Sequence, residues 1–257
     1  ETVAPPALAE AWDNVGLQVG DPRCPVSRVW VALDPAPAVI TAACRARVDL
    51  LVVHHPLIFR PLKRIDGAAP QGASILEAAA QRLAVYAMHT NFDAAAGGLN
   101  DALARRIGLR RPGLLGAGAG AQQGACGIGR IGRLATGMSA RELARVVKQR
   151  LAIGRVRLAG DPGMRVERVA LVAGSGGSLL PLFLQSRAEV LVTGDLGYHD
   201  AREIEAAGRA AIDVGHFHSE KMMAEDVAAR LRRRLQRRRP PVRVDACTLE
   251  RDPFVFV

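Results

Sequence analysis

Short runs of apolar, mostly β-branched residues alternate along the chain with longer alanine-rich stretches of helical periodicity. Strands separated by helices of about 10–15 residues are typical of βαβ units with a mostly parallel sheet. The pattern therefore predicts an α/β fold. The expected strands are residues 28–34, 49–55, 84–90, 166–174, 188–195 and 210–215, and the expected helices are residues 35–48, 72–83, 98–108, 139–151, 177–185, 200–207 and 216–238.

The alternation is interrupted by a glycine-rich stretch at residues 112–129, which lacks periodicity and is typical of a loop or linker. This stretch separates an N-terminal half, residues 1–111, from a C-terminal half, residues 130–257. The expected helix at 139–151 starts with a capping-box pattern, because Ser139 is followed three residues later by Glu142. We thus expect two α/β halves joined by a linker.

The composition is that of a globular protein, since 49% of the 257 residues are apolar and 23% are charged. No run approaches the roughly 18–20 apolar residues of a membrane-spanning helix, and the N-terminal residues show no secretory signal. The cysteines are scattered without a CxxC pair, which argues against a disulfide framework and a thiolate zinc site. We expect a reducing, cytoplasmic setting. The cysteines are Cys24, Cys44, Cys126 and Cys247.

The formal net charge of +10 is partly local, because the segment Arg230–Arg239 is almost wholly basic. Such a run is most simply a solvated helix end, where cations also interact favourably with the helix dipole. A surface that binds phosphate or nucleic acid is the alternative. The run contains no aromatic residue that could stack on bases, which weakens the nucleic-acid interpretation.

The histidines are distributed unevenly with respect to the expected elements. All of them lie at or just beyond the C-terminal end of an expected strand, the edge at which open α/β sheets bind ligands. A random distribution would place some of them on helix surfaces. The histidines are His54, His55, His89, His199, His216 and His218.

His54 and His55 follow a buried apolar run and precede Pro56. Adjacent residues of a strand point to opposite faces, so both imidazoles can bind metal only if the strand ends there. Pro56 supports such an end, because proline cannot continue a central ladder. The alternative is one core histidine and one surface histidine.

Two further motifs carry candidate ligands. Asp93 is expected in a polar loop, where it could instead cap the helix that follows. His216 and Glu220 are four residues apart and share one face if a helix begins at His216, whereas His218 would point roughly to the opposite side. Glu220 could also simply interact with the helix dipole.

Other polar residues at the strand ends are candidates for a supporting or catalytic role. His89 could hydrogen-bond to a metal ligand without binding metal itself, or could move protons. Asp195 and His199 could supply a general base, a substrate contact or a partner of a ligand. The glycine-rich segment 174–178 could cradle a phosphate, although tight βα turns need glycine in any case.

Together the motifs give three histidines and two carboxylates from three strand ends. A single zinc site uses three or four protein ligands, whereas five with one bridging carboxylate suit two ions about 3.5–4 Å apart. Nitrogen and oxygen ligands are compatible with Zn, Fe, Mn, Co or Ni and do not choose among them. We predict two divalent ions per chain, bound by His54, His55, Asp93, His216 and Glu220.

The motifs and their order resemble the YbgI-like dinuclear-metal-centre family, the GTP cyclohydrolase I type 2 homologues. The resemblance implies these same five metal ligands, an α/β fold of two similar halves with the metal site in the cleft between them, and a ring-shaped homohexamer. The chain resembles the short form, without an inserted domain. The motifs are WDNVGLQVGD from Trp12, VALD from Val31, HHPLIF from His54, PLKRI from Pro61, HTNFDAAAGGLND from His89, GSGGS from Gly174, TGDxxYHD from Thr193 and GHxxSE from Gly215.

One departure from the family pattern is Gly197, where many relatives have a larger side chain.

Three functions are compatible with these observations. The first is a metal-dependent hydrolase of a nucleotide or similar small molecule, with His89, Asp195 or His199 moving protons. The second is a nucleic-acid-associated protein, and the third is a non-enzymatic metal-binding or assembly protein.

Overall fold

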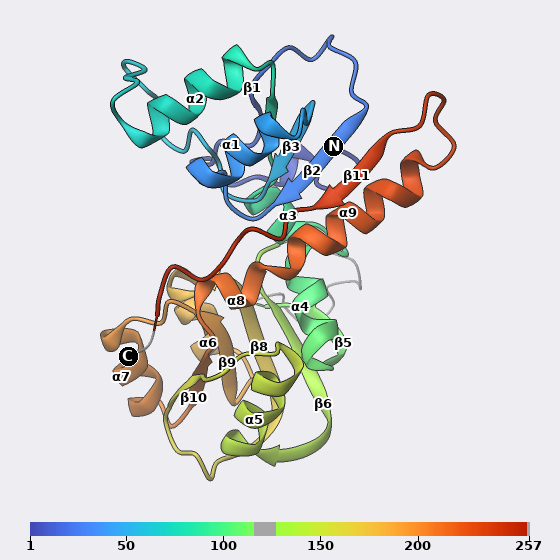
Figure 1. The fold of residues 1–257 in the computed structure, drawn as a ribbon. Helices are drawn as coiled ribbons and strands as arrows, with labels where there is room; N and C mark the ends of the chain where they lie inside the picture. The colour runs from blue at the N-terminus through green and yellow to red at the C-terminus, as the bar shows by residue number, and fades with distance from the viewer. Residues whose placement is uncertain (116–126, 256–257) are drawn as a thin grey trace. The chain divides into compact units, whose positions relative to one another are not determined.

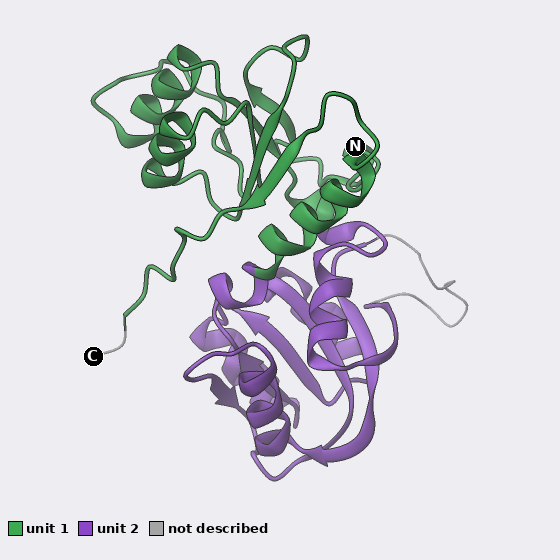
Figure 2. Cartoon of the chain, turned by 45° about the vertical axis from the view of Figure 1, so that its right-hand side comes forward, with its two compact units in different colours: residues 1–92, 222–257 green, residues 93–221 purple. Residues whose placement is uncertain are grey.

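The computed structural model describes residues 1–115 and 127–255. They form two compact units, shown in different colours in Figure 2. Unit 1 contains residues 1–92 and 222–257, and unit 2 contains residues 93–221. Each unit has its own sheet and its own core, so the expected α/β fold with two sheets is confirmed.

Unit 1 is built on a five-stranded sheet in the order β1-β4-β3-β2-β11. Strands β11, β2, β3 and β4 are parallel, and β1 pairs antiparallel with β4. Helices α1 and α2 lie on one face, and α9 packs on β2 and β11 (Figure 1). The bounds are β1 Gly16–Val19, β2 Arg28–Ala32, β3 Leu50–Val53, β4 Ala84–Ala87, β11 Arg243–Ala246, α1 Pro37–Arg45, α2 Pro70–Ala80, α9 Met222–Leu235 and the 3-10 helix η1 Pro6–Leu8.

The core of unit 1 explains why these segments form these elements. Alternate residues of the strands, such as Leu51 and Val53 of β3, are fully buried against Ile40 of α1 and Ile75 of α2. Val52 between them is buried as well, as expected of a strand whose two faces are both covered. Because β2, β3 and β4 are parallel, they end at the same edge of the sheet, and the loops that follow them lie together there.

Unit 2 is built on a mixed six-stranded sheet in the order β5-β6-β8-β9-β10-β7. Strands β8, β9 and β10 are parallel and central, and the flanking pairs are antiparallel. The bounds are β5 Arg110–Leu114, β6 Arg130–Ser139, β7 Arg157–Ala159, β8 Arg165–Ser175, β9 Val190–Gly194, β10 Ala210–Asp213, α4 Leu99–Ile107, α5 Ala140–Arg150, α6 Leu180–Gln185, α7 Tyr198–Ala206, α8 His216–Glu220 and the 3-10 helix η2 Gly177–Leu179. The predicted capping box is present, because Ser139 Oγ accepts from Glu142 N at 3.2 Å.

The boundaries of the units differ from the halves expected from the sequence. The sequence predicts halves at 1–111 and 130–257, but α9 and β11 pack on β2 and so belong to the first unit. Residues 93–115 belong to the second unit, because α4 packs on β8 and β5 pairs with β6. Part of the expected linker is therefore strand β5, while residues 116–126 lie outside the described residues.

Two local expectations are wrong. The single long helix expected at 216–238 is two helices, α8 and α9, which are separated at Lys221. Asp93 does not lie in a loop but in the short helix α3, Thr90–Ala94, and the residue at the N-cap of α4 is Gly98. Among the residues that the structure describes, no helix is long and apolar enough to cross a membrane. Cys24, Cys44 and Cys247 are free thiols, and Cys126 lies outside the described residues.

Candidate metal centre

His54 and His55 come directly after β3, which ends at Val53 as the following proline suggested. Their backbone N–H groups both donate to Leu33 O, at 3.1 and 2.9 Å, so the chain stays fixed to the end of β2. The two rings lie on the same side of the chain, with centroids 5.0 Å apart. The end of the strand thus removes the alternation that would otherwise point these imidazoles to opposite faces.

Both histidines of this pair are oriented through Nδ1. The Nδ1 atom of His54 lies 2.8 Å from Met88 O, and that of His55 lies 2.6 Å from Asp34 Oδ1. A carbonyl or a carboxylate oxygen can only accept, so each Nδ1 carries the hydrogen and each neutral ring has its lone pair on Nε2. This is the arrangement in which protein histidines bind metal, with the other nitrogen donating to an oxygen that fixes the ring.

Asp34 is itself held by the C-terminal segment of unit 1. Glu250 accepts hydrogen bonds from the backbone N–H groups of Leu33, at 2.9 Å, and Asp34, at 2.6 Å. Burial raises the pKa of Glu250, and these two hydrogen bonds only partly offset that effect. Glu250 therefore fixes the end of β2, from which Asp34 orients His55.

His89 joins the same cluster, although the sequence marked it only as a supporting residue. One nitrogen each of His54, His55 and His89 lie within 4.8 Å of one another. His89 Nδ1 is 2.9 Å from Asp13 Oδ1, and Thr90 N donates to Asp13 Oδ2 at 3.0 Å. Burial acts to raise the pKa of Asp13, but the hydrogen bonds from His89 and Thr90 outweigh it and lower this pKa to about 2.

In unit 2, His216 and Glu220 lie on one face of α8 as their spacing predicted. His216 Nε2 is 3.1 Å from Glu220 Oε2, and the Glu220 side chain is buried while His216 is partly exposed. Helix α8 follows β10 through Gly215, whose φ of 80° suits glycine. The local chain therefore brings an imidazole and a carboxylate to the carboxyl end of a parallel strand.

Asp195 orients His216 in the same way that Asp34 orients His55. Its Oδ2 atom lies 2.7 Å from His216 Nδ1, so Nδ1 donates to Asp195, while Nε2 is the nitrogen that faces Glu220. Asp195 adopts a φ of 51°, a left-handed conformation that is uncommon for residues other than glycine. Strain of this kind concentrates at functional sites. The structure thus makes Asp195 a partner of His216.

The end of β8 packs closely against this pair. A Cβ atom at Gly174, whose φ is 65°, would lie 2.3 Å from Glu220 Oε1 and 3.3 Å from His216 Nε2. Gly174 N also donates to Ser219 Oγ at 2.8 Å, and Ser219 Oγ donates to His216 O at 2.7 Å. Close packing against Glu220 therefore accounts for the first glycine of the segment 174–178, whose role in phosphate binding stays a prediction.

The remaining predicted residues are Asp93, His199 and His218. Asp93 is buried in α3, but it is absent from the group formed by His54, His55 and His89. His199 is exposed in the first turn of α7 and contacts the ring of Tyr198. His218 contacts the ring of Phe217. The metal role of Asp93 and the catalytic role of His199 stay predictions.

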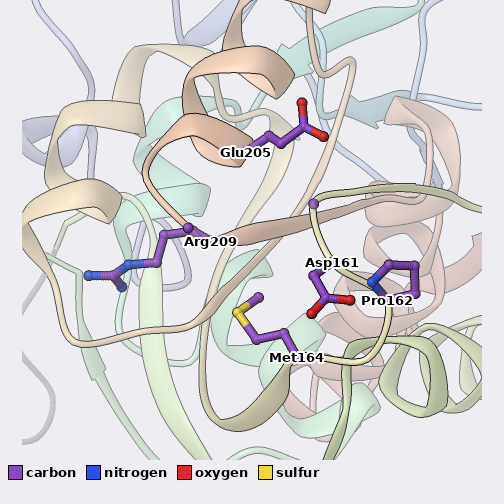
Figure 3. A pocket seen from close by; sticks show the side chains of 7 residues that line it. Asp161, Pro162, Met164, Glu205 and Arg209 are labelled. Carbon is purple, nitrogen blue, oxygen red and sulfur yellow. The ribbon is translucent and has the colours of Figure 1, made fainter.

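A separate hollow of unit 2 lies at the other end of the sheet. Its volume is about 580 Å³, and it is lined by residues of the β7–β8 turn and of the loop before β10 (Figure 3). Asp161 and Glu205 are at this hollow, whereas the guanidinium of Arg209 donates to Ser186 O at 3.1 Å and to Ala188 O. The hollow borders the amino ends of parallel strands, opposite the edge that carries His216, so we do not assign it to the metal centre.

The donor set fits divalent transition metals. Unit 1 presents three imidazoles and unit 2 an imidazole with a carboxylate, all of them nitrogen or oxygen donors. His54, His55 and His216 each have Nδ1 held by an oxygen, the arrangement in which protein histidines can bind metal through Nε2. Such donors are compatible with Zn, Fe, Mn, Co or Ni.

Comparison with known proteins identifies the family. The family model for Duf34/NIF3 (NGG1p interacting factor 3) matches residues 1–253. The chain belongs to the DUF34/NIF3 family. A DUF34/NIF3 relative named GTP cyclohydrolase 1 type 2 homolog, from Clostridium perfringens, is 32% identical over the whole chain and 96% of the relative. The Protein NIF3 homolog of Schizosaccharomyces pombe is 34% identical over 88% of this chain and 84% of that one.

A solved structure agrees with this assignment. The chain is similar to a Bacillus cereus protein related to NIF3, with a TM-score of 0.92 and 26% identity over all of this chain and 96% of that chain. The resemblance seen in the sequence motifs is therefore confirmed at the level of the DUF34/NIF3 family and its fold.

Sequence reasoning did not assign roles to several residues of this centre. Asp34 and Asp13 lie within the motifs VALD and WDN; the position of Asp34 at the end of an expected strand is a signal that could have marked it, and Asp13 has no such signal. Asp195 was a candidate without a defined partner. Ser219 and Glu250 act through backbone groups, Ser219 at Gly174 and Glu250 at Leu33 and Asp34, and a sequence gives no indication of such contacts.

Proposed function

We propose that this protein binds two divalent metal ions through His54, His55, Asp93, His216 and Glu220, and that it hydrolyses a nucleotide or a similar small molecule. One observation carries the proposal. In both units, histidines at the carboxyl ends of strands have Nδ1 held by an oxygen acceptor, which makes Nε2 the nitrogen that can bind metal. The names of curated relatives, GTP cyclohydrolase 1 type 2 homolog, make GTP the first substrate to test.

The residues of the chain have distinct tasks in this proposal. Asp34 and Asp195 keep His55 and His216 in the tautomer that binds metal and increase the basicity of Nε2. Bound divalent ions supply electrophilic activation of the scissile bond and lower the pKa of water. The arrangement at His89 resembles that of a general base, because its Nδ1–H donates to the Asp13 carboxylate and leaves Nε2 to accept a proton.

The test is metal-dependent turnover. Protein stripped with a chelator and reloaded with each metal in turn should release product from GTP, or from another nucleoside triphosphate, only in the reloaded state. His54→Ala should abolish that turnover, and the matched variant His218→Ala should retain it. Turnover that is unaffected by the chelator, or equal in both variants, would contradict the proposal.

A second candidate, nucleic-acid binding, is favoured by a basic hollow in unit 2. This hollow has a volume of about 610 Å³, and its lining contains four arginines and no acidic residue. Guanidinium groups bind phosphates in bidentate geometry, and a concave basic surface concentrates the positive potential. Single-stranded DNA should then bind with an affinity that falls steeply as salt rises. The arginines are Arg111, Arg133, Arg168 and Arg187.

A further inference from the structure

Two large aromatic side chains of unit 1 are exposed beside the histidine cluster. Trp12 is 59% exposed and Phe59 is 41% exposed. Their ring centroids are 5.9 Å apart, and the Trp12 ring is 6.2 Å from that of His89. Large aromatic rings contribute strongly to stability when buried, so exposed ones next to a candidate site point to a ligand.

The segments that carry the two rings are held by hydrogen bonds of neighbouring side chains. Asp13, the residue after Trp12, accepts from His89 and Thr90. The next residue, Asn14, donates through Nδ2 to Ile58 O, one residue before Phe59. Ile58 N in turn donates to Gln18 Oε1 at 2.9 Å. The segments that carry Trp12 and Phe59 are therefore tied to each other.

No two of these aromatic rings stack in parallel. Phe59 and His89 contact Trp12 with interplanar angles of 72° and 75°, so both contacts are edge-to-face. Phe59 and His89 are also nearly perpendicular, at 85°. Neither ring stacks in parallel on Trp12. A planar ring could do so and would then lie beside His89, whose own ring is 5.2 Å from that of His54.

We propose that Trp12 and Phe59 form an aromatic platform on which the planar heteroaromatic ring of an anionic small molecule stacks beside His89. Stacking on an aromatic side chain tolerates different bases, because every base has a π-face. The charge of the neighbouring segment favours an anionic ligand, since Arg60, Lys63 and Arg64 are exposed directly after Phe59. The nature of the reaction on this ligand rests on the proposed function, whereas the stacking does not.

The binding test uses the metal-free protein and two probes. The chain has two tryptophans, and Trp30 packs in the core of unit 1. In a Trp30→Phe background, Trp12 is the sole fluorescent indole. Guanosine 5′-monophosphate should quench its emission saturably, whereas ribose 5-phosphate, which has the phosphate but no ring, should not. Quenching by both probes or by neither overturns the platform.

Variants then test the contribution of each ring by equilibrium dialysis with guanosine 5′-monophosphate. Trp12→Leu and Phe59→Leu should each lower the affinity about tenfold, the loss typical of one stacking partner. Phe254→Leu removes a ring that is also exposed, at 71%, and should leave the affinity unchanged. Equal affinities in all three variants overturn the proposal. So does unchanged binding in a Trp12→Leu variant that forms a smaller oligomer, because the rings would then serve self-association.

The two proposals fail separately. If guanosine 5′-monophosphate binds to the metal-free protein but no metal-dependent turnover is found, only the hydrolase proposal is contradicted. Turnover with an unchanged KM in Trp12→Leu contradicts the aromatic platform alone.

Discussion

The substitution Gly174→Ala probes the close packing of β8 against Glu220. The added Cβ would lie 2.3 Å from Glu220 Oε1, whereas ordinary contacts start at 3.4 Å. The carboxylate must therefore move by about 1 Å, well beyond the tolerance of about 0.2 Å in a metal–ligand distance. Changes that only reorient a ligand reduce metal affinity about 10–100-fold. We expect Gly174→Ala to reduce affinity by about 100-fold or more.

The control is Gly208→Ala. Gly208 has a φ of 64°, close to the 65° of Gly174, but no atom lies within 4 Å of a Cβ added there. A left-handed conformation costs an L-residue about 1–2 kcal/mol, so Gly208→Ala should lose about 2–8 °C in Tm when melted in chelator, and Gly174→Ala at least as much. Metal affinity, measured by competition with a chromogenic chelator, should fall only in Gly174→Ala. Equal metal affinity of both variants would show that Glu220 has no contact with metal.

Four further predictions concern metal, charge and assembly. Glu220→Ala should lose more metal than His218→Ala, since Glu220 lies 3.1 Å from His216 Nε2; equal losses with the fold intact would refute the assignment. Asp195→Asn should weaken metal binding about 10–100-fold by disturbing His216, and an unchanged affinity would exclude this role. Replacing the exposed arginines of Arg230–Arg239 by glutamine should leave metal content unchanged and reduce any salt-sensitive DNA binding; in the absence of such binding, the run is a solvated helix end. Light scattering should give the hexamer that the sequence resemblance implies, and a monomeric mass would contradict it.

The strands were predictable from the sequence where they are continuous apolar runs. Strands β3, β4 and β10 are such runs; β3 and β10 begin and end within two residues of their expected bounds, and β4 begins at the expected residue and ends three residues earlier. Strand β11 was missed, because its short sequence RVDA becomes a strand only by pairing with β2, more than 200 residues away. Helix α3 has five residues, which is too short for periodicity to indicate a helix.

The candidate site was predictable in its residue types but not in its connections. The spacing of His216 and Glu220 fixes their shared face, because both lie on one short helix. The contacts of His55 with Asp34 and of His216 with Asp195 each span 21 residues and depend on neighbouring strands. The approach of Gly174 to Glu220 depends in the same way on packing between β8 and α8. Long-range contacts of this kind follow from tertiary structure and leave no local pattern.

The most direct test of the account is the metal stoichiometry of the purified protein. Protein prepared without chelator, and the same protein after loading with each candidate metal and desalting, should be measured by elemental analysis against amino-acid concentration. The account predicts about two divalent ions per chain, because five nitrogen and oxygen ligands with one bridging carboxylate suit two ions. A value that stays at one or below after loading would contradict the dinuclear centre.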